Sequence, residues 1–145
     1  MKKMADEKTI KLNEEQLINA FASERANMEA IQSNISAAGN RLRDILAATE
    51  ALKAIQKAKE NEKIVVPIGA GVFIDASLES NSTAKNSIAG GVVVNADIEG
   101  ILKDLAEKKQ EMEKVIAEMQ KDLERVVANV NSLGGVLRTM EQKQQ

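Results

Sequence analysis

Two short segments of this chain contain residue types that bind or carry chemical groups in other proteins. Gly69-Ala70-Gly71 has the spacing that begins a phosphate-binding loop, but it lacks the third glycine, the lysine and the following helix of such a loop. Asn81-Ser82-Thr83 fits the acceptor pattern for N-glycosylation, which operates on secreted proteins. We interpret the first segment as a hairpin turn and the second as a polar loop.

The side-chain inventory excludes several classes of catalytic site. The chain contains no His and no Cys, so it has neither an imidazole for acid–base catalysis nor a thiolate ligand for zinc. Its Glu and Lys residues are interleaved along the chain, as on a solvated helix face, and no pair of them marks an acid–base site. We therefore expect no enzymatic activity, no metal and no cofactor.

The composition predicts long helices rather than a compact globular core. Of 145 residues, 43% are hydrophobic and 29% are charged, yet Phe21 and Phe73 are the only aromatic residues. The net charge of −2 arises from mixed acids and bases that form no basic face for nucleic acid. The N-terminal MKKMADEKTIKLNEEQ lacks the apolar core of a secretory signal, and no segment approaches a membrane span. We expect a cytoplasmic protein without nucleic-acid or membrane partners.

Apolar residues recur at alternating spacings of four and three in two long segments. A seven-residue repeat that is kept over about six heptads is typical of a coiled coil. The first stripe, which is apolar except for Glu14, Glu24 and Thr49, comprises Ile10, Glu14, Leu17, Phe21, Glu24, Met28, Ile31, Ile35, Ala38, Leu42, Ile45, Thr49 and Leu52. The second, which is apolar except for Lys109, comprises Ile98, Leu102, Leu105, Lys109, Met112, Ile116, Met119, Leu123, Val126, Val130, Leu133, Leu137 and Met140.

The two stripes are equal in length, and the segment that joins them is long enough only for a compact connection. We therefore predict one domain over residues 1–145, in which helices at about 10–60 and 97–141 fold back on each other as an antiparallel coiled coil. Ile10 then lies near Met140 at a distal tip, and Leu52 lies near Ile98 at the base.

Residues 63–95 change to a β-strand pattern. Apolar runs flank Gly69-Ala70-Gly71 and again Ala89-Gly90-Gly91, which predicts two β-hairpins joined by a polar link at residues 80–86. Pro67 lacks a backbone donor, so its strand is expected at an edge or interrupted there. Because isolated hairpins are marginal in water, we expect these strands to pair with other chains.

These motifs resemble the alpha class of the prefoldin family over nearly the whole chain. The most specific segment is VVPIGAGVFI at residues 65–74, a valine-proline strand followed by a Gly-Ala-Gly turn and a second apolar strand. The segment AGGVVV at residues 89–94 is similar to the second hairpin, although the family often has Gly-Ala-Gly at that turn. Two hairpins fit the alpha class, since beta-class subunits have one.

The resemblance implies an α+β fold in which the central hairpins form an oligomeric β-barrel platform that carries the long antiparallel coiled-coil hairpin. It implies a hexamer of two alpha and four beta subunits, with a two-component archaeal system as the favoured source. The distal tips would bind unfolded or nascent polypeptides and transfer them to a group II chaperonin without ATP hydrolysis. The alternative is a structural or tethering coiled coil that assembles through its hairpins.

The candidate site residues fall into two groups. An apolar stripe that frays near the tips exposes non-directional hydrophobic surface for unfolded clients, although such residues also form ordinary coiled-coil cores. The tip candidates are Ile10, Leu17, Phe21, Val126, Val130, Leu133, Leu137 and Met140. The assembly candidates are Ile64, Val66, Ile68, Val72, Ile74, Ile88, Val92 and Val94, with Gly69, Gly71, Gly90 and Gly91 in the turns.

Gly134 and Gly135 interrupt the second stripe near the tip, where each glycine costs a helix about 1 kcal/mol relative to alanine. One interpretation is that they loosen the last turns so that Val136, Leu137 and Met140 turn outward. The other is that the helix ends there, before the tail EQKQQ.

Overall fold

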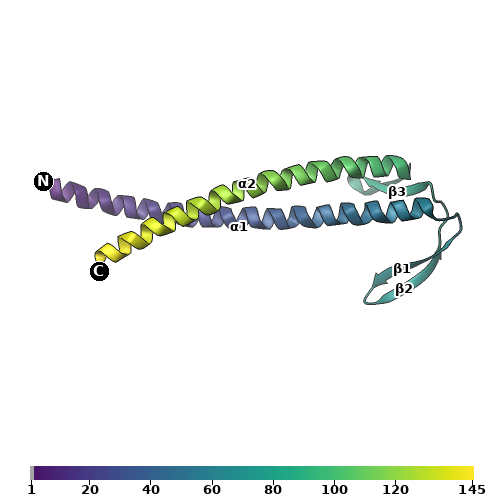
Figure 1. Ribbon diagram of the computed structural model, residues 1–145, viewed down its shortest axis with the longest axis horizontal. Coiled ribbons are helices and arrows are strands. Elements are labelled where there is room, and N and C mark those ends of the chain that lie inside the picture. Colours follow the sequence, from purple (N-terminus) through teal and green to yellow (C-terminus); the bar gives the residue numbers. More distant parts are fainter. Residues whose placement is uncertain (1) are drawn as a thin grey trace. The chain divides into compact units, whose positions relative to one another are not determined.

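The computed structural model consists of two long helices and two β-hairpins (Figure 1). It describes the backbone of residues 2–145 and the side chains of residues 14–145. In chain order the elements are α1 (Lys2–Lys57), β1 (Lys63–Gly69), β2 (Val72–Ser77), β3 (Thr83–Ile88), the short 3-10 helix η1 (Ala89–Gly91), β4 (Val92–Asp97) and α2 (Ile98–Gln144). The predicted α+β fold of two long helices around two hairpins is confirmed.

Contacts along the chain group it into two compact units. The first, here called the helical unit, comprises the part of α1 up to Gly39 together with the part of α2 from Lys114 onward. The second, the hairpin unit, comprises Asn40–Glu113 and contains all four strands.

In the helical unit the two helices run antiparallel. The side-chain amide of Gln144 donates to the carboxylate of Glu14 across 3.4 Å, and the amide of Asn129 donates to the carboxylate of Glu24 across 3.5 Å. Residue numbers therefore rise along one helix where they fall along the other. This is the predicted antiparallel arrangement.

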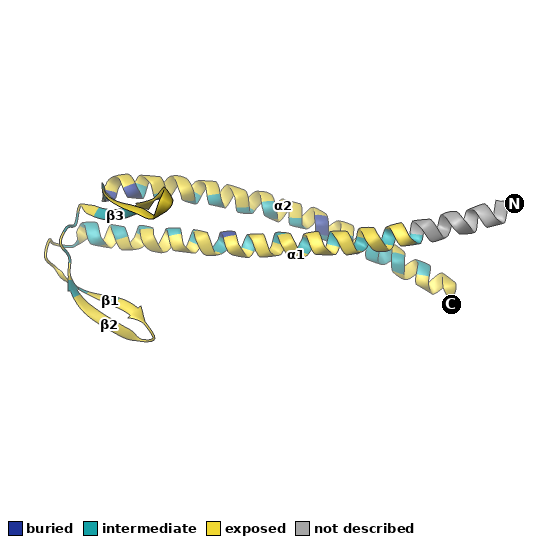
Figure 2. Ribbon diagram, turned by 180° about the vertical axis from the view of Figure 1, so that it is seen from behind, coloured by how far each residue is buried: buried dark blue, intermediate teal, exposed yellow. Residues whose placement is uncertain are grey.

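The seven-residue repeat accounts for which helical residues are covered. Every stripe residue with a described side chain is buried or half-buried, and most residues between the stripe positions are exposed (Figure 2). A repeat of seven keeps one narrow face of a helix toward its partner, so only that face loses water contact. The stripe positions are thus confirmed from Glu14 onward, whereas the side chain of Ile10 lies outside the described residues.

The first hairpin has an irregular register next to its proline. β1 and β2 pair antiparallel, with Pro67 opposite Phe73 and Gly69 opposite Val72, so Ile68 is left without a partner. This bulge agrees with the expected interruption at Pro67, which cannot donate to a ladder. The turn then bends back through Gly69 at φ 112°, a backbone conformation that residues with a side chain rarely adopt.

The second hairpin is regular and begins earlier than its composition predicts. β3 and β4 pair from Thr83 opposite Asp97 to Ile88 opposite Val92. The prediction of a polar link over residues 80–86 is therefore wrong, because β3 already starts at Thr83. Thr83 and Lys85 lie on one face of the strand and Ala84 and Ile88 on the other. The polar residues of the first face give this segment the composition of a loop.

Two short hydrogen bonds tie the segment just before β3 to the helix ends of the hairpin unit. The side-chain amide of Asn81 donates to the carbonyl oxygen of Ala58 at 2.9 Å, just after the end of α1. The backbone N–H of Ile98, at the start of α2, donates to the carbonyl of Ser82 at 2.9 Å, and its side chain is fully buried. The Asn81 segment therefore connects both helix ends rather than serving only as a loose polar loop.

The second helix does not end at its glycine pair. α2 continues as a helix through Gly134 and Gly135 to Gln144. The interpretation that these glycines end the helix is therefore wrong. The side chains of Arg138 and Thr139 donate to the carbonyl oxygens of Gly134 and Gly135, one turn earlier, and so stay close to this part of the backbone.

Candidate functional surfaces

The structure places the described tip candidates on two facing stripes of the helical unit. α1 carries Leu17 and Phe21, and α2 carries Val126, Val130, Leu133, Leu137 and Met140. Val126 is buried, with 2% of its surface exposed, while the other six remain half-buried. Two helices alone thus cover this apolar surface only partly.

Phe21 and Gly134 meet directly across the two helices. A Cβ atom added to Gly134 would lie 3.3 Å from Cε2 of Phe21, closer than ordinary van der Waals contact. The same addition at Gly135 would meet nothing within 4 Å. Gly134 therefore makes room for the Phe21 ring, a role that neither sequence interpretation of the glycine pair anticipated.

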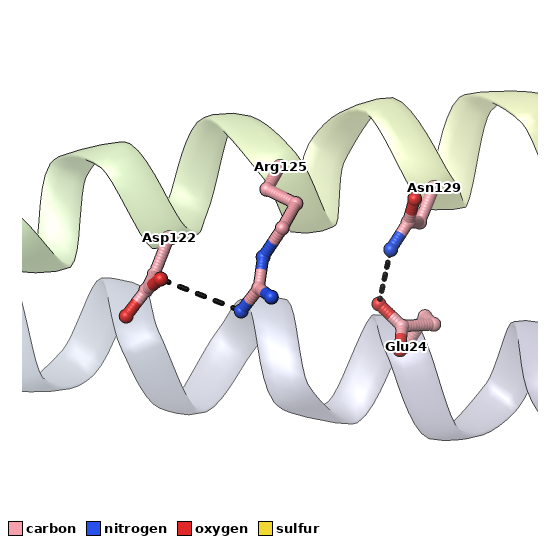
Figure 3. Close-up of polar contacts among 4 residues, drawn as sticks. All are labelled: Glu24, Asp122, Arg125 and Asn129. Carbon is pink, nitrogen blue, oxygen red and sulfur yellow. Dashed lines mark hydrogen bonds and ion pairs between the residues drawn. The ribbon is translucent and has the colours of Figure 1, made fainter.

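Polar side chains accompany the apolar stripe in the middle of the helical unit. Figure 3 shows Glu24 of α1 and Asn129 of α2 pointing toward each other, with Arg125 and Asp122 paired along α2. The Arg125–Asp122 pair, at 3.4 Å, is exposed on both sides and contributes little to stability. Glu24 instead occupies a stripe position, so its pairing with Asn129 places a polar contact beside the apolar seam.

The assembly candidates lie on the hairpins, where a single chain leaves most of them open to solvent. Ile64 and Val66 are half-buried, whereas Ile68, Val72, Ile74, Ile88, Val92 and Val94 are exposed. Each hairpin forms only a two-stranded sheet, so its edges have no further strand partner within the described chain. That these residues mediate assembly stays a prediction, but their exposure leaves them available for it.

Sequence comparison decides the family. The family described as "Prefoldin subunit" matches residues 25–145, which include both hairpins and all of α2. The chain belongs to the prefoldin family. Prefoldin subunits are chaperone subunits that assemble into oligomers.

The curated prefoldin relatives are alpha subunits of archaea. A prefoldin subunit alpha of Methanobrevibacter smithii is 28% identical over 98 residues, which cover 68% of this chain and 66% of the relative. That of Thermofilum pendens is 24% identical over 76% of this chain and 85% of the relative. Another, from Nitrosopumilus maritimus, is 32% identical over about half of each chain (51% and 50%). The chain thus spans just under two thirds of the first relative and more of the second.

A solved prefoldin structure shares the fold. The filamentous prefoldin from Methanocaldococcus jannaschii, determined by cryo-electron microscopy, superposes with a TM-score of 0.67 over 81% of this chain and 97% of the other. The sequences are 14% identical, so the similarity concerns the fold alone. It agrees with the arrangement of helices and hairpins that the sequence resemblance implied.

Several exposed residues of this prefoldin chain were not among the assembly candidates. Val65 and Phe73 lie on the opposite face of the first hairpin from Val66 and Ile74, and they are 62% and 61% exposed. Val93 is similarly placed on the second hairpin. The continuous apolar runs IVVPI, VFI and VVV could have indicated them, because a strand without polar alternation is typical of one covered on both faces.

The described part of the chain shows neither a cluster of metal ligands nor a membrane-spanning helix. Among residues 14–145, no three acidic side chains gather as metal ligands. None of the described helices has an apolar stretch that could cross a bilayer.

Proposed function

We propose that this chain is the alpha subunit of a cytoplasmic holdase complex. Its tips bind unfolded or nascent polypeptides without ATP, and the complex transfers them to a group II chaperonin. The complex contains two copies of this chain and four beta subunits, joined through their hairpins. Family membership and the archaeal alpha-subunit relatives support this proposal.

The observation that carries the proposal is the half-covered apolar stripe of the helical unit. Leu133, Leu137 and Met140 sit at stripe positions, yet each keeps part of its surface exposed because only one other helix faces it. Apolar surface attracts apolar surface without directional preference, so it suits clients of unrelated sequence. Met140 adds a flexible, polarizable side chain that adapts to different partners.

The exposed hairpins support the assembly part of the proposal. Val72, Ile74, Val92 and Val94 would be an aggregation hazard on a free monomer, because they combine open strand edges with apolar faces. Pairing with the strands of other subunits closes the open edges and covers the apolar faces. A β-barrel platform is one closed arrangement that does so.

Aggregation suppression tests the proposed function. The complex that co-purifies with this chain is mixed, without ATP, with several unrelated proteins diluted from denaturant, and light scattering is followed. A holdase lowers the scattering of each client, and its clients are captured by an added group II chaperonin. If no client is protected, the holdase proposal is wrong.

A structural role is the second candidate. One solved structure that shares this fold is described as filamentous, which favours an alternative in which copies of this chain assemble with one another. Native mass spectrometry separates the two candidates. Two copies with four shorter, single-hairpin chains support the holdase subunit, whereas a homodimer or an open series of homo-oligomers supports the structural role.

A further inference from the structure

A groove opens beside Gly134 in the helical unit. It has a volume of about 320 Å³ and is lined by Phe21 from α1 and by Val130, Asn131, Gly134, Leu137, Arg138 and Glu141 from α2. Gly134 keeps the groove open next to Phe21, since a Cβ there would approach the ring to 3.3 Å. One missing methyl group thus leaves the ring of Phe21 accessible beside the helix.

The lining has an apolar base and a polar rim. Phe21, Val130 and Leu137 supply the apolar surface, while Arg138 and Glu141 supply a donor and an acceptor. Arg138 stays near the groove because its Nε donates to the carbonyl oxygen of Gly134 at 3.4 Å. A guanidinium group can bond a peptide carbonyl and a carboxylate can bond a peptide N–H. The rim therefore offers both a donor and an acceptor to the backbone of a peptide whose side chain enters the groove.

We propose that this groove is a binding subsite for one aromatic side chain of an unfolded polypeptide. The inference rests on the proposed holdase function and specifies the client feature that this surface recognises. The volume lies at the lower end of the range for small-molecule pockets, so it admits a side chain and not a folded element. Phe21 favours an aromatic occupant, because aromatic pairs gain energy beyond the burial of their area.

The two adjacent glycines provide a matched pair of variants. Gly134→Ala puts a methyl group against Phe21, whereas Gly135→Ala meets nothing within 4 Å. Both changes raise helix propensity equally, so a difference between them reports the groove rather than the helix. Phe21→Leu is a third variant, which removes the ring but keeps the space beside Gly134.

The probe is a peptide of Gly, Ser and Gln that carries one p-azidophenylalanine. It is irradiated with the assembled complex, and the cross-links to this chain are mapped by mass spectrometry. Wild type and Gly135→Ala are expected to cross-link at Phe21, Val130 or Leu137, and Gly134→Ala is expected to lower that yield about threefold to tenfold. An unlabelled phenylalanine peptide should compete better than its leucine counterpart, and Phe21→Leu should remove that preference.

Three outcomes would overturn the subsite proposal. They are cross-links that map elsewhere on this chain, equal cross-link yields from the two glycine variants, or equal competition by the leucine and phenylalanine peptides. Aggregation suppression measured on the same samples separates this failure from a failure of the proposed function. A wild-type complex that protects clients but fails these tests lacks the subsite and remains a holdase. One that protects none refutes the holdase proposal itself.

Discussion

Val126 offers the most direct measure of how much burial in the helical unit contributes to stability. It sits on the stripe of α2 with 2% of its surface exposed, while Val115 on the same helix is 45% exposed. Val126→Ala should lower the free energy of unfolding by about 1–2 kcal/mol more than Val115→Ala, since only the first leaves a cavity. The change in helix propensity is the same for both. Urea unfolding at one fixed protein concentration gives the difference, and equal effects would contradict the assigned packing.

The burial of the stripe residues was predictable from the sequence, but the residues that they contact on the other helix were not. The seven-residue repeat identifies Phe21 as a core position because periodicity is a local property. That Phe21 packs against Gly134 depends on the exact offset between two helices far apart in sequence, which no local pattern contains. The same limit applies to Asn129, which pairs with Glu24 from outside the stripe.

At the scale of the helix pair, Glu24 places a carboxylate in a mostly apolar seam. Polar residues at core positions of coiled coils fix the register at some expense in stability. Glu24→Leu should therefore raise the free energy of unfolding by about 1 kcal/mol, because a half-buried leucine gains more than the long 3.5 Å bond to Asn129 contributes. Glu29→Leu, an exposed position on the same helix, is the control and should change little. A loss of stability in Glu24→Leu alone would mean that the polar pair stabilises the unit.

Within the hairpins, the turn glycines carry a conformational requirement that a helical glycine does not. Gly69 has φ 112°, whereas Gly100 lies inside α2 and a Cβ there would meet no neighbour. Gly69→Ala should reduce stability by about 1–3 kcal/mol through backbone strain, and Gly100→Ala should increase it by up to about 1 kcal/mol. Thermal unfolding followed by circular dichroism measures both. Equal shifts in one direction would refute the assigned turn conformation.

The extent of the elements could be predicted to different degrees. Both helices follow from their stripes, and the first hairpin follows from its apolar runs around Gly69-Ala70-Gly71. The start of β3 could not be recognised, because Thr83, Lys85 and Ser87 give its outer face the composition of a loop. A strand with one polar face depends on its partner for stability, so it carries a weaker local signal than a buried one.

At the scale of the whole molecule, the faces of the second hairpin predict which side joins other subunits. Ile88 lies on the face shared with Ala84 and Val94, and Ser87 lies on the face of Thr83 and Lys85. Both side chains are exposed in the single chain, so neither substitution disturbs a packed core. If assembly buries the apolar face, Ile88→Lys places an unpaired charge in the interface while Ser87→Lys leaves a charge in water.

Native mass spectrometry of the two variants, each expressed with its partners, distinguishes these cases. Ile88→Lys should weaken association by roughly a hundredfold or more, so that free chains replace the assembled complex, and Ser87→Lys should assemble as wild type does. Assembly of both variants would place the interface elsewhere, with Val65 and Phe73 of the first hairpin as the next exposed apolar residues to change. Loss of assembly in both would mean that the subunits contact the second hairpin on its two faces, as expected for a strand pair enclosed between layers rather than one lining a barrel.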